Sequence, residues 1–174
     1  MANRSLDYFL FNLEKQKHLD WTKRYEIVKG IAQGIQYFHE DARLKIIHGD
    51  LKPSNILLDN DMNPKISDLA LAKVLQMGET EGNDNRIVGT YGFLAPEVLL
   101  HVVYSIKSDV FSFGVLLFEI ISGRKNHNLI NDAKSLLDYA WELWNDGKPL
   151  ELLDPTIRES IIRQSYTPNE VIRC

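Results

Sequence analysis

Residue types that bind metal ions and phosphate groups are concentrated between residues 48 and 68. The octapeptide His48-Gly49-Asp50-Leu51-Lys52-Pro53-Ser54-Asn55 holds a carboxylate, an amine and an amide, and Asp68 follows further along the chain. Carboxylate and amide oxygens are hard ligands that suit Mg²⁺. Phosphoryl transfer needs such ligands, together with cations, placed in advance around the charge that spreads over phosphoryl oxygens.

Each of these residues also has an ordinary structural explanation. Asp50, Asn55 or Asp68 taken alone could be a turn residue or a helix cap. His48 could be a packed core histidine, and Lys52 a solvated surface charge. Only their combination with further motifs favours chemistry over structure.

Two helices are expected before this cluster. Ser5 is a candidate N-cap for a short helix through about Phe11, and Asp20 for a longer helix over residues 21–39. The apolar positions of the longer helix recur at steps of four and three, which indicates one buried face. That face comprises Trp21, Tyr25, Val28, Ala32 and Ile35, and it is widened by Ile27, Ile31 and Phe38.

Short strands are expected around the polar cluster, at residues 46–47, 56–58 and 65–67. Residues 75–93 show no clear period and are expected to form a long loop, a kind of segment that is usually functional or disordered. Residues 108–122 have almost no polar face, which predicts a buried helix that ends at Gly123. A further helix is expected at 135–145, and Thr167-Pro168-Asn169-Glu170 is a capping box that opens another.

Four motifs stand in an order that resembles the protein kinase family. Residues 48–55 resemble the catalytic loop His-Arg-Asp-Leu-x-x-x-Asn, and Asp68 resembles the metal-binding aspartate of Asp-Phe-Gly. Ala95-Pro96-Glu97 resembles the end of a kinase activation segment, and Ser108-Asp109-Val110 opens the buried helix as in kinases. Each match alone is weak, but four in the correct order over nearly the whole chain form a specific pattern.

The subfamily can be narrowed by longer strings. The segments NRSLDYFLF, DLKPSNILLD, PKISD, NRIVGTYGFLAPE and KSDVFSFGVLLFEIISGRKN are similar to plant receptor-like kinases of the cysteine-rich and S-locus types. Those are serine/threonine kinases, and Lys52 with Thr90 agrees with that class. The resemblance implies ATP and Mg²⁺ as cofactors, a protein substrate, and a cytoplasmic location, at the plasma membrane if a membrane-anchored parent receptor contains the chain.

The resemblance implies an α+β fold, that of the C-terminal lobe of a protein kinase, mainly α-helical with short β-strands around the catalytic loop. This lobe would occupy residues 1–174, from about the hinge to the start of the helix after residue 167. The catalytic loop would be 48–55 and the activation segment 68–97. The chain contains no Gly-rich phosphate loop, so the N-terminal lobe is expected to be absent and the chain alone inactive.

The resemblance also assigns a role to individual residues. Asp50 would accept or orient the proton of the substrate hydroxyl, and Lys52 would steady the transferring phosphoryl group. Asn55 and Asp68 would hold Mg²⁺ against the ATP phosphates. The remaining assignments are Leu57 at the floor of the adenine pocket, Ser5 at the ribose edge, Thr90 hydrogen-bonded to Asp50, Asp109 tying the loop backbone to the buried helix, and a structural His48. The peptide groove is expected near Thr90 and the helix at 135–145.

The chain departs from the family pattern at several positions. Gly49 replaces the arginine that normally receives an activation-loop phosphate. Leu69 is expected to fill part of the slot of the phenylalanine it replaces. Ala70 is the graver change, since glycine there permits backbone angles that a Cβ disfavours. Asp84 stands where close relatives usually carry a phosphorylatable threonine, and it could either mimic phosphate or reflect drift.

Glu97 leads to an expectation about stability. In the family an arginine from the last helices pairs with this glutamate, and the chain holds no such partner. A buried carboxylate without its partner costs about 3–5 kcal/mol, against a typical domain stability of about 5–15 kcal/mol. A marginal or aggregating fold is therefore expected, without a single cooperative melt above about 50 °C.

Composition excludes some other classes of function. The chain has 174 residues and a formal charge of −4, which disfavours nucleic acid as the main partner because phosphate binding needs a basic patch. No signal peptide or membrane-spanning stretch is recognisable. The lone cysteine, Cys174, allows no internal disulfide.

Three functions stay open. The first is part of a serine/threonine receptor-like kinase, favoured by Asp50, Lys52, Asn55 and Asp68. The second is a truncated pseudokinase that acts as a binding or decoy module, favoured by Gly49, Leu69 and Ala70. The third is a gene fragment without function.

Overall fold

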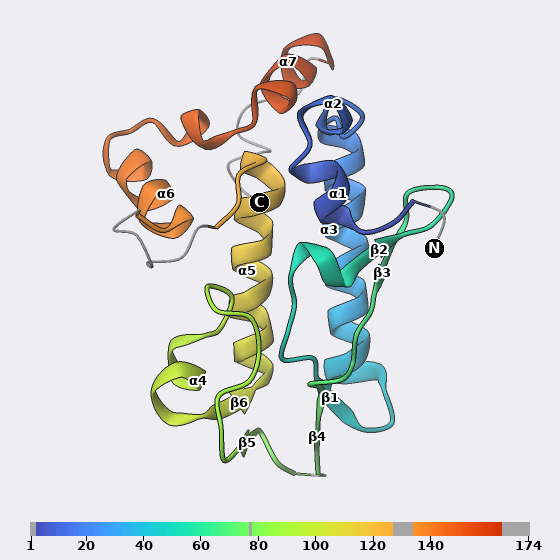
Figure 1. The fold of residues 1–174 in the computed structure, drawn as a ribbon, viewed down its shortest axis with the longest axis vertical. Helices are drawn as coiled ribbons and strands as arrows, with labels where there is room; N and C mark the ends of the chain where they lie inside the picture. Colours follow the sequence, from blue (N-terminus) through green and yellow to red (C-terminus); the bar gives the residue numbers. More distant parts are fainter. Residues whose placement is uncertain (1–2, 77, 127–133, 165–174) are drawn as a thin grey trace.

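Two long helices form the centre of the molecule. The computed structural model describes residues 3–76, 78–126 and 134–164. In it α3 (Trp21–Gln36) and α5 (Ile106–Ser122) lie side by side along the longest axis (Figure 1). Both helices were predicted. The segments that carry the polar residues 48–68 are arranged along the length of these two helices.

Helix α3 begins where predicted and ends earlier. The carboxylate of Asp20 accepts a hydrogen bond from the backbone N–H of Lys23 at 3.0 Å, which is a helix N-cap. After Gln36 the chain continues as a π-helical turn, Tyr37–Asp41. Such turns interrupt helices frequently at functional sites, and this one carries the buried His39.

The buried face of α3 differs from the predicted one. Tyr25 is 44% exposed, whereas Arg24 is fully buried. Arg24 can be buried because its guanidinium finds an anion and backbone carbonyls, and its aliphatic stem packs like an apolar side chain. The buried residues of this helix are Trp21, Arg24, Ile27, Ile31 and Ile35.

Helix α5 is capped at both ends. At its start, Ser105 and Ser108 form a capping box, and at its end Gly123 adopts φ +66°, the left-handed conformation that favours glycine. The predicted span of 108–122 is thus extended by two residues at the start. The helix is not buried all round, since Val110 is 54% exposed.

The strands pair into three small antiparallel sheets. β1 (Lys45–Ile47) pairs with β4 (Lys73–Leu75), and β2 (Ile56–Leu58) pairs with β3 (Pro64–Ile66). β5 (Glu81–Asn83) pairs with β6 (Val103–Ser105). The three predicted strands are confirmed to within a residue or two, but the expectation of a structureless loop over 75–93 is wrong, because β5 lies inside it.

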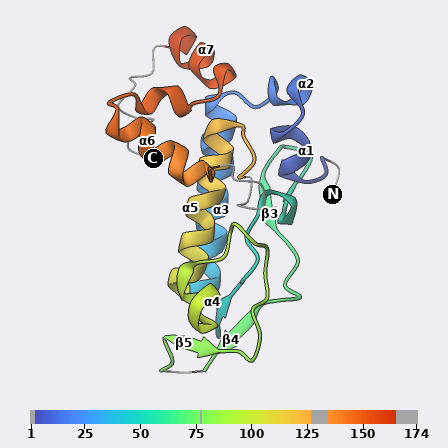
Figure 2. The ribbon, with the colours of Figure 1, turned by 60° about the vertical axis from the view of Figure 1, so that its left-hand side comes forward.

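The remaining helices lie at the two ends of this pair. α1 (Leu6–Leu10), α2 (Leu13–Gln16) and α7 (Pro155–Gln164) lie at one end with α6 (Leu136–Asn145), and α4 (Pro96–His101) lies toward the other end with β4 and β5 (Figures 1 and 2). Pro53–Asn55 and Pro149–Leu152 form 3₁₀ turns. The helix predicted from Thr167 lies outside the described residues. None of the described helices combines the length and apolarity that a bilayer crossing requires.

The largest apolar core joins α1, α3, α5 and β2. Its buried residues come from all four elements, so the polar cluster at residues 48–55 that precedes β2 rests on this core. They are Leu6, Leu10, Leu19, Ile27, Ile31, Ile35, Leu51, Ile56, Leu58, Phe93, Val115, Leu116 and Ile120.

One carboxyl group of α5 is buried with no cation at hydrogen-bond distance among the residues that the structure describes. Glu119 is 3% exposed, and its Oε1 accepts the backbone N–H of Asn126 at 2.6 Å. Burial raises its pKa to about 7, against opposing contributions from the Asn126 hydrogen bond and the charge of Lys125, while Asp7 adds to the rise. Near neutral pH this residue therefore changes charge inside the fold.

Glu119 should make stability fall as pH rises. Its folded pKa lies above the ordinary glutamate value of about 4.3, so the folded state binds the proton more tightly. Stability from this group is complete below about pH 4 and is lost as pH rises through 7. We expect the stability of Glu119→Gln relative to the wild-type chain to increase by about 3 kcal/mol between pH 5 and pH 8. Urea unfolding at both pH values measures it, and an unchanged difference would contradict the shift.

Candidate active site

The carboxylate of Asp50 is the centre of a compact polar cluster. Thr90 Oγ1 donates to Asp50 Oδ1 at 2.5 Å, and Lys52 Nζ lies 2.7 Å from Asp50 Oδ2. Lys52 Nζ also donates to Thr90 Oγ1 at 2.7 Å, which closes a triangle of three side chains. Asn55 Nδ2 donates to Asp50 Oδ2 at 3.1 Å and to its backbone oxygen at 2.8 Å. Asp50 is 6% exposed, so its carboxylate is held nearly rigid in a mostly buried position.

Asp109, at the start of α5, holds the backbone of this loop. Its Oδ2 accepts the N–H of His48 at 2.8 Å and its Oδ1 accepts the N–H of Gly49 at 2.9 Å. His39 Nε2, from the π-helical turn, lies 2.9 Å from Oδ2. Asp109 is 1% exposed. The buried carboxylate therefore joins residues 48–49 to α5 and to the π-helical turn that follows α3.

His48 has a defined tautomer. Its Nδ1 accepts the backbone N–H of Asp50 at 3.2 Å, so this nitrogen carries no proton. The other nitrogen, Nε2, then carries the hydrogen and donates to the backbone oxygen of Ser67 at 3.0 Å. The buried His48 thus links the backbone of Asp50 to the residue that precedes Asp68.

Gly49 occupies a position that suits glycine. Its φ is +77°, and a Cβ there would lie 3.3 Å from the backbone oxygen of Leu71. Gly89, with φ +121°, packs against it, because a Cβ on Gly89 would come within 2.8 Å of the backbone oxygen of Gly49. The two glycines let the segment around Gly89 approach residues 48–55 closely, and this approach places Thr90 on Asp50.

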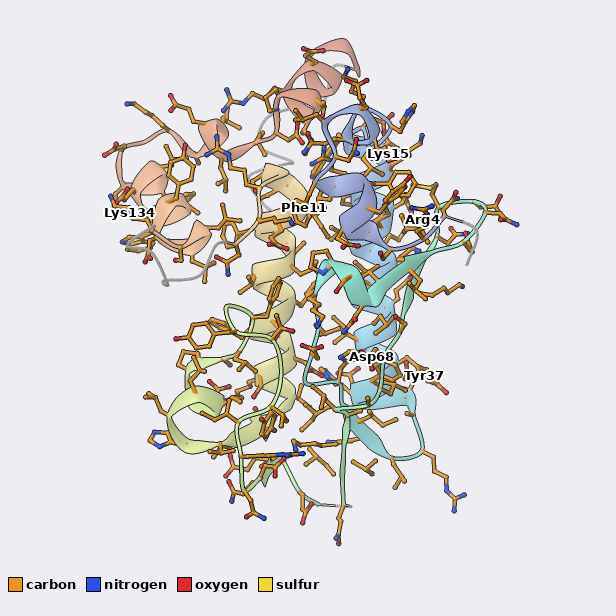
Figure 3. The ribbon with its side chains drawn as sticks, in the orientation of Figure 1. Arg4, Phe11, Lys15, Tyr37, Asp68 and Lys134 are labelled. Carbon is orange, nitrogen blue, oxygen red and sulfur yellow. The ribbon has the colours of Figure 1, made fainter. Side chains whose placement is uncertain are left out.

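Asp68 lies at the edge of this cluster. Ser67 ties it there, since the N–H and Oγ of Ser67 both donate to the backbone oxygen of Asn55 at 2.9 Å. Asp68 is exposed and adopts φ +65°, an uncommon conformation for a residue with a Cβ. Figure 3 shows it in the lower half of the molecule, below β2 and β3.

The structure corrects two expectations about the residues after Asp68. Leu69 is 48% exposed, so it does not fill an interior slot as expected for a phenylalanine substitute. Ala70 is not among the residues with positive φ, so its Cβ causes no backbone strain. The strained position is instead Asp68, whose Oδ1 accepts the N–H of Ala70 at 3.3 Å.

Asn55 and Asp68 fit a Mg²⁺ ion bound together with phosphate. Both side-chain hydrogen bonds of Asn55 are donated by Nδ2. Within the part of the chain that the structure describes, its Oδ1 accepts no hydrogen bond, so this oxygen could bind a cation. No group of three or more histidine, cysteine or acidic side chains in the described part of the chain could hold a metal ion. Two protein ligands suit Mg²⁺, which keeps several waters and takes substrate phosphates as further ligands.

Ser5 and Leu57, assigned to the nucleotide, lie beside each other. They form an isolated antiparallel β-bridge, flanked by a hydrogen bond from the N–H of Leu58 to the backbone oxygen of Arg4 at 2.8 Å. Leu57 belongs to β2, directly after the 3₁₀ turn that carries Asn55. The segment before α1 is thus paired with β2 through its backbone.

Asp84 has a cationic partner that the sequence analysis did not name. Lys73 of β4 forms an ion pair with it, and the hydrogen bond from Lys73 holds the pKa of Asp84 below its usual range. Lys73 Nζ also lies 4.3 Å from the ring centre of Tyr104. An acidic side chain at this position is therefore received by Lys73 and does not depend on residue 49.

The burial of Glu97 costs less free energy than expected. It is half-buried, and Ser108 Oγ donates to its Oε1 at 3.1 Å. The expected cost of about 3–5 kcal/mol applies to a buried carboxylate left without a partner. Because Glu97 keeps a donor and some solvent, that expectation is wrong in its premise.

Comparison with known proteins gives a consistent similarity. The family described as the protein kinase domain matches residues 1–145. Over the whole chain, cysteine-rich receptor-like protein kinase 10 of Arabidopsis thaliana is 56% identical. Cysteine-rich receptor-like protein kinases 11 and 5 of the same plant are 55% and 53% identical over 99% and 100% of the chain. The chain spans only about a quarter of the length of these relatives, 26% in each case.

Proposed function

The chain belongs to the protein kinase family, in its plant cysteine-rich receptor-like branch, and we propose that it is the catalytic-loop portion of a serine/threonine kinase domain. The proposed reaction is transfer of the γ-phosphoryl group of ATP to a serine or threonine hydroxyl of a protein. The observation that carries the proposal is the Asp50–Lys52–Thr90 triangle with Asn55 behind it. A turn or cap residue has no need of this convergence.

The residues of this chain divide the work as follows. Asp50, fixed through both carboxylate oxygens, accepts the proton of the incoming hydroxyl. Lys52, already beside that carboxylate, meets the negative charge of the transferring group. Thr90 bonds to both and so fixes the distance between the proton acceptor and the cation. When bound, Mg²⁺ would neutralise phosphate charge from Asn55 Oδ1 and Asp68.

The ATP site needs a second part that the 174 residues do not supply. The chain contains no Gly-x-Gly sequence and so no Gly-rich loop to cover phosphates. We propose that Ser5 and Leu57 form one wall of the nucleotide site and that an N-terminal lobe closes it. In the proposed parent protein this domain stands on the cytoplasmic side of the plasma membrane.

A chimera tests the function. In this "lobe chimera", residues 1–174 replace the matching segment of cysteine-rich receptor-like protein kinase 10, aligned over 176 residues. We expect Mg²⁺-dependent phosphorylation of serine or threonine with a kcat within about tenfold of the parent. The 174-residue chain alone should be at least about 10³-fold slower, because positioning is most of the catalysis of this reaction. Phosphoamino-acid analysis with [γ-³²P]ATP, with and without EDTA, measures both.

A pseudokinase is the second candidate, favoured by the exposed Leu69 and the strained, exposed Asp68. It predicts a lobe chimera that melts cooperatively but transfers no phosphate. Restoring the family residues through Leu69→Phe and Ala70→Gly, without a substitution at the left-handed Gly49, should then fail to rescue activity. Rescue by these two changes would instead assign the inactivity to the substitutions and retain the kinase assignment of Asp50 and Lys52.

A further inference from the structure

Asn126 joins three separate parts of the chain. Its side-chain Nδ2 donates to the backbone oxygen of Gly92 at 2.8 Å, and its Oδ1 accepts the N–H of Leu136, the first residue of α6, at 3.1 Å. Its own N–H donates to Glu119 of α5 at 2.6 Å. One residue therefore connects the end of the activation segment, the start of α6 and the buried carboxyl of α5.

The part of the activation segment that it holds is a tight turn. This substrate-facing turn, Thr90–Phe93, is closed by the N–H of Phe93, which donates to the backbone oxygen of Thr90 at 3.1 Å. Gly92 within it adopts φ +90°, which favours glycine. The turn begins at the residue that contacts Asp50 and Lys52, so its position sets what can approach the Asp50 carboxylate.

Side chains hold the turn at three points: its start, its middle and its far end. Thr90 is held by Asp50 and Lys52, as described above. At the far end Ser112 Oγ, on α5, donates to the backbone oxygen of Phe93 at 2.7 Å. Asn126 holds the middle through Gly92. The first two anchors belong to the loop and to α5, whereas Asn126 couples the turn to α6.

Resting on the proposed function, we propose that Asn126 is a positioning residue that fixes the substrate-facing turn for binding of the protein substrate. The role requires a donor and an acceptor on one short side chain, and the amide of asparagine supplies them on two separate atoms, Nδ2 and Oδ1. Aspartate keeps the acceptor for Leu136 and loses the donor for Gly92. Alanine loses both. Comparing the two substitutions therefore distinguishes the effect of losing the bond to the turn from the effect of losing the bond to α6.

The test compares Asn126→Asp and Asn126→Ala in the lobe chimera, with a serine peptide that the wild-type chimera phosphorylates. A half-buried carbonyl deprived of its donor is costly, so we expect KM for the peptide to rise about tenfold in Asn126→Asp, with KM for ATP unchanged. Hydrogen exchange of the Phe93 amide should quicken by a similar factor. In Asn126→Ala the Leu136 amide also loses its acceptor, so hydrogen exchange should quicken at Leu136 as well as at Phe93. The control Asn63→Asp, which loses a side-chain bond to Asp59 on the β2–β3 turn, should change none of these.

Each outcome decides the proposal. Unchanged Phe93 exchange in a cooperatively melting Asn126→Asp chimera would overturn it, as would equal rises of KM for peptide and ATP. If Asn126→Asp does not fold, Asn126→Ala, which also loses the donor for Gly92, supplies the exchange and KM comparison, and unchanged Phe93 exchange in it would overturn the proposal. If the wild-type chimera folds but is inactive, the proposed function fails, whereas exchange at Phe93 still shows whether Asn126 fixes the turn.

Discussion

Replacing Asp50 with asparagine should lower kcat of the lobe chimera by about 10²–10⁴-fold, the usual contribution of a general base. The substitution keeps the size of the side chain. It also keeps an oxygen that can accept the hydrogen bond that Thr90 donates to Asp50 Oδ1 in the wild-type chain, at 2.5 Å. It removes the negative charge that accepts the proton and pairs with Lys52. Steady-state phosphorylation of peptide at saturating ATP measures the loss.

The nucleotide should still bind normally in this variant. Asp50 contacts Lys52, Asn55 and Thr90, whereas the proposed nucleotide wall is formed by Ser5 and Leu57. Asn55, the proposed Mg²⁺ ligand, keeps its hydrogen bond to the backbone oxygen of residue 50 in this variant, so we expect KM for ATP to change by less than about threefold. Asp61→Asn is the matched control, an exposed carboxylate on the β2–β3 turn. A loss of activity of less than about tenfold in Asp50→Asn would contradict the assignment of Asp50 as the base.

The site was more predictable from the sequence than the scaffold around it. Residues 48–55 bond to one another, and this local part of the geometry is visible in the motif, whereas their bonds to Ser67, Thr90 and Asp109 depend on segments further along the chain. Caps are equally local, and Asp20, Ser135 and Gly123 end or begin helices where expected. Local chemistry that repeats within a few residues is visible in a single sequence.

Features that depend on distant partners were missed. β5 is Glu81–Asn83, without the alternation of a strand, and it exists through its backbone pairing with β6 about twenty residues later. Lys73 and Asp84 meet because β4 and β5 are held by other strands. Asn126 carries no local pattern at all, since its three partners lie on three elements.

Arg24 is the clearest of these misses. The periodicity of α3 places it beside the apolar stripe, and an arginine is normally assigned to the surface. Its partner Asp154 stands 130 positions away along the chain. Glu97 is only half-buried, whereas Arg24 and Asp154 are buried. The buried charges that most need a partner therefore lie at the interface between α3, α5 and α7 and not at Glu97.

The Arg24–Asp154 pair is buried and fully hydrogen-bonded on the arginine side. Arg24 Nη2 lies 2.6 Å from Asp154 Oδ2, and the side chains are 0% and 2% exposed. Arg24 also donates from Nη1 to the backbone oxygen of Ile120 at 2.6 Å and from Nε to that of Leu19 at 2.9 Å. Burial lowers the pKa of Arg24, and the charge of Asp154 opposes that shift.

Removing one partner of this pair should have the largest effect on stability. Arg24→Met leaves the Asp154 carboxylate buried and uncompensated, which costs about 3–5 kcal/mol, or a fall in Tm of about 10 °C for a domain of this size. The double variant Arg24→Met/Asp154→Asn removes both charges and keeps the Asp154 Oδ1 acceptor for the N–H of Thr156, 2.8 Å away. We expect it to recover at least about half of the loss.

Thermal melts of the wild type, both single variants and the double variant give the coupling energy between the two residues. The exposed pair Lys17–Glu14, with side chains 60% and 82% exposed, is the control and should contribute less than about 0.5 kcal/mol. If Arg24→Met and Lys17→Met lower Tm equally, burial of the Arg24–Asp154 pair does not govern stability. If the double variant melts no higher than Arg24→Met, the loss comes from the backbone carbonyls of Leu19 and Ile120, deprived of their donors, and not from the isolated carboxylate of Asp154.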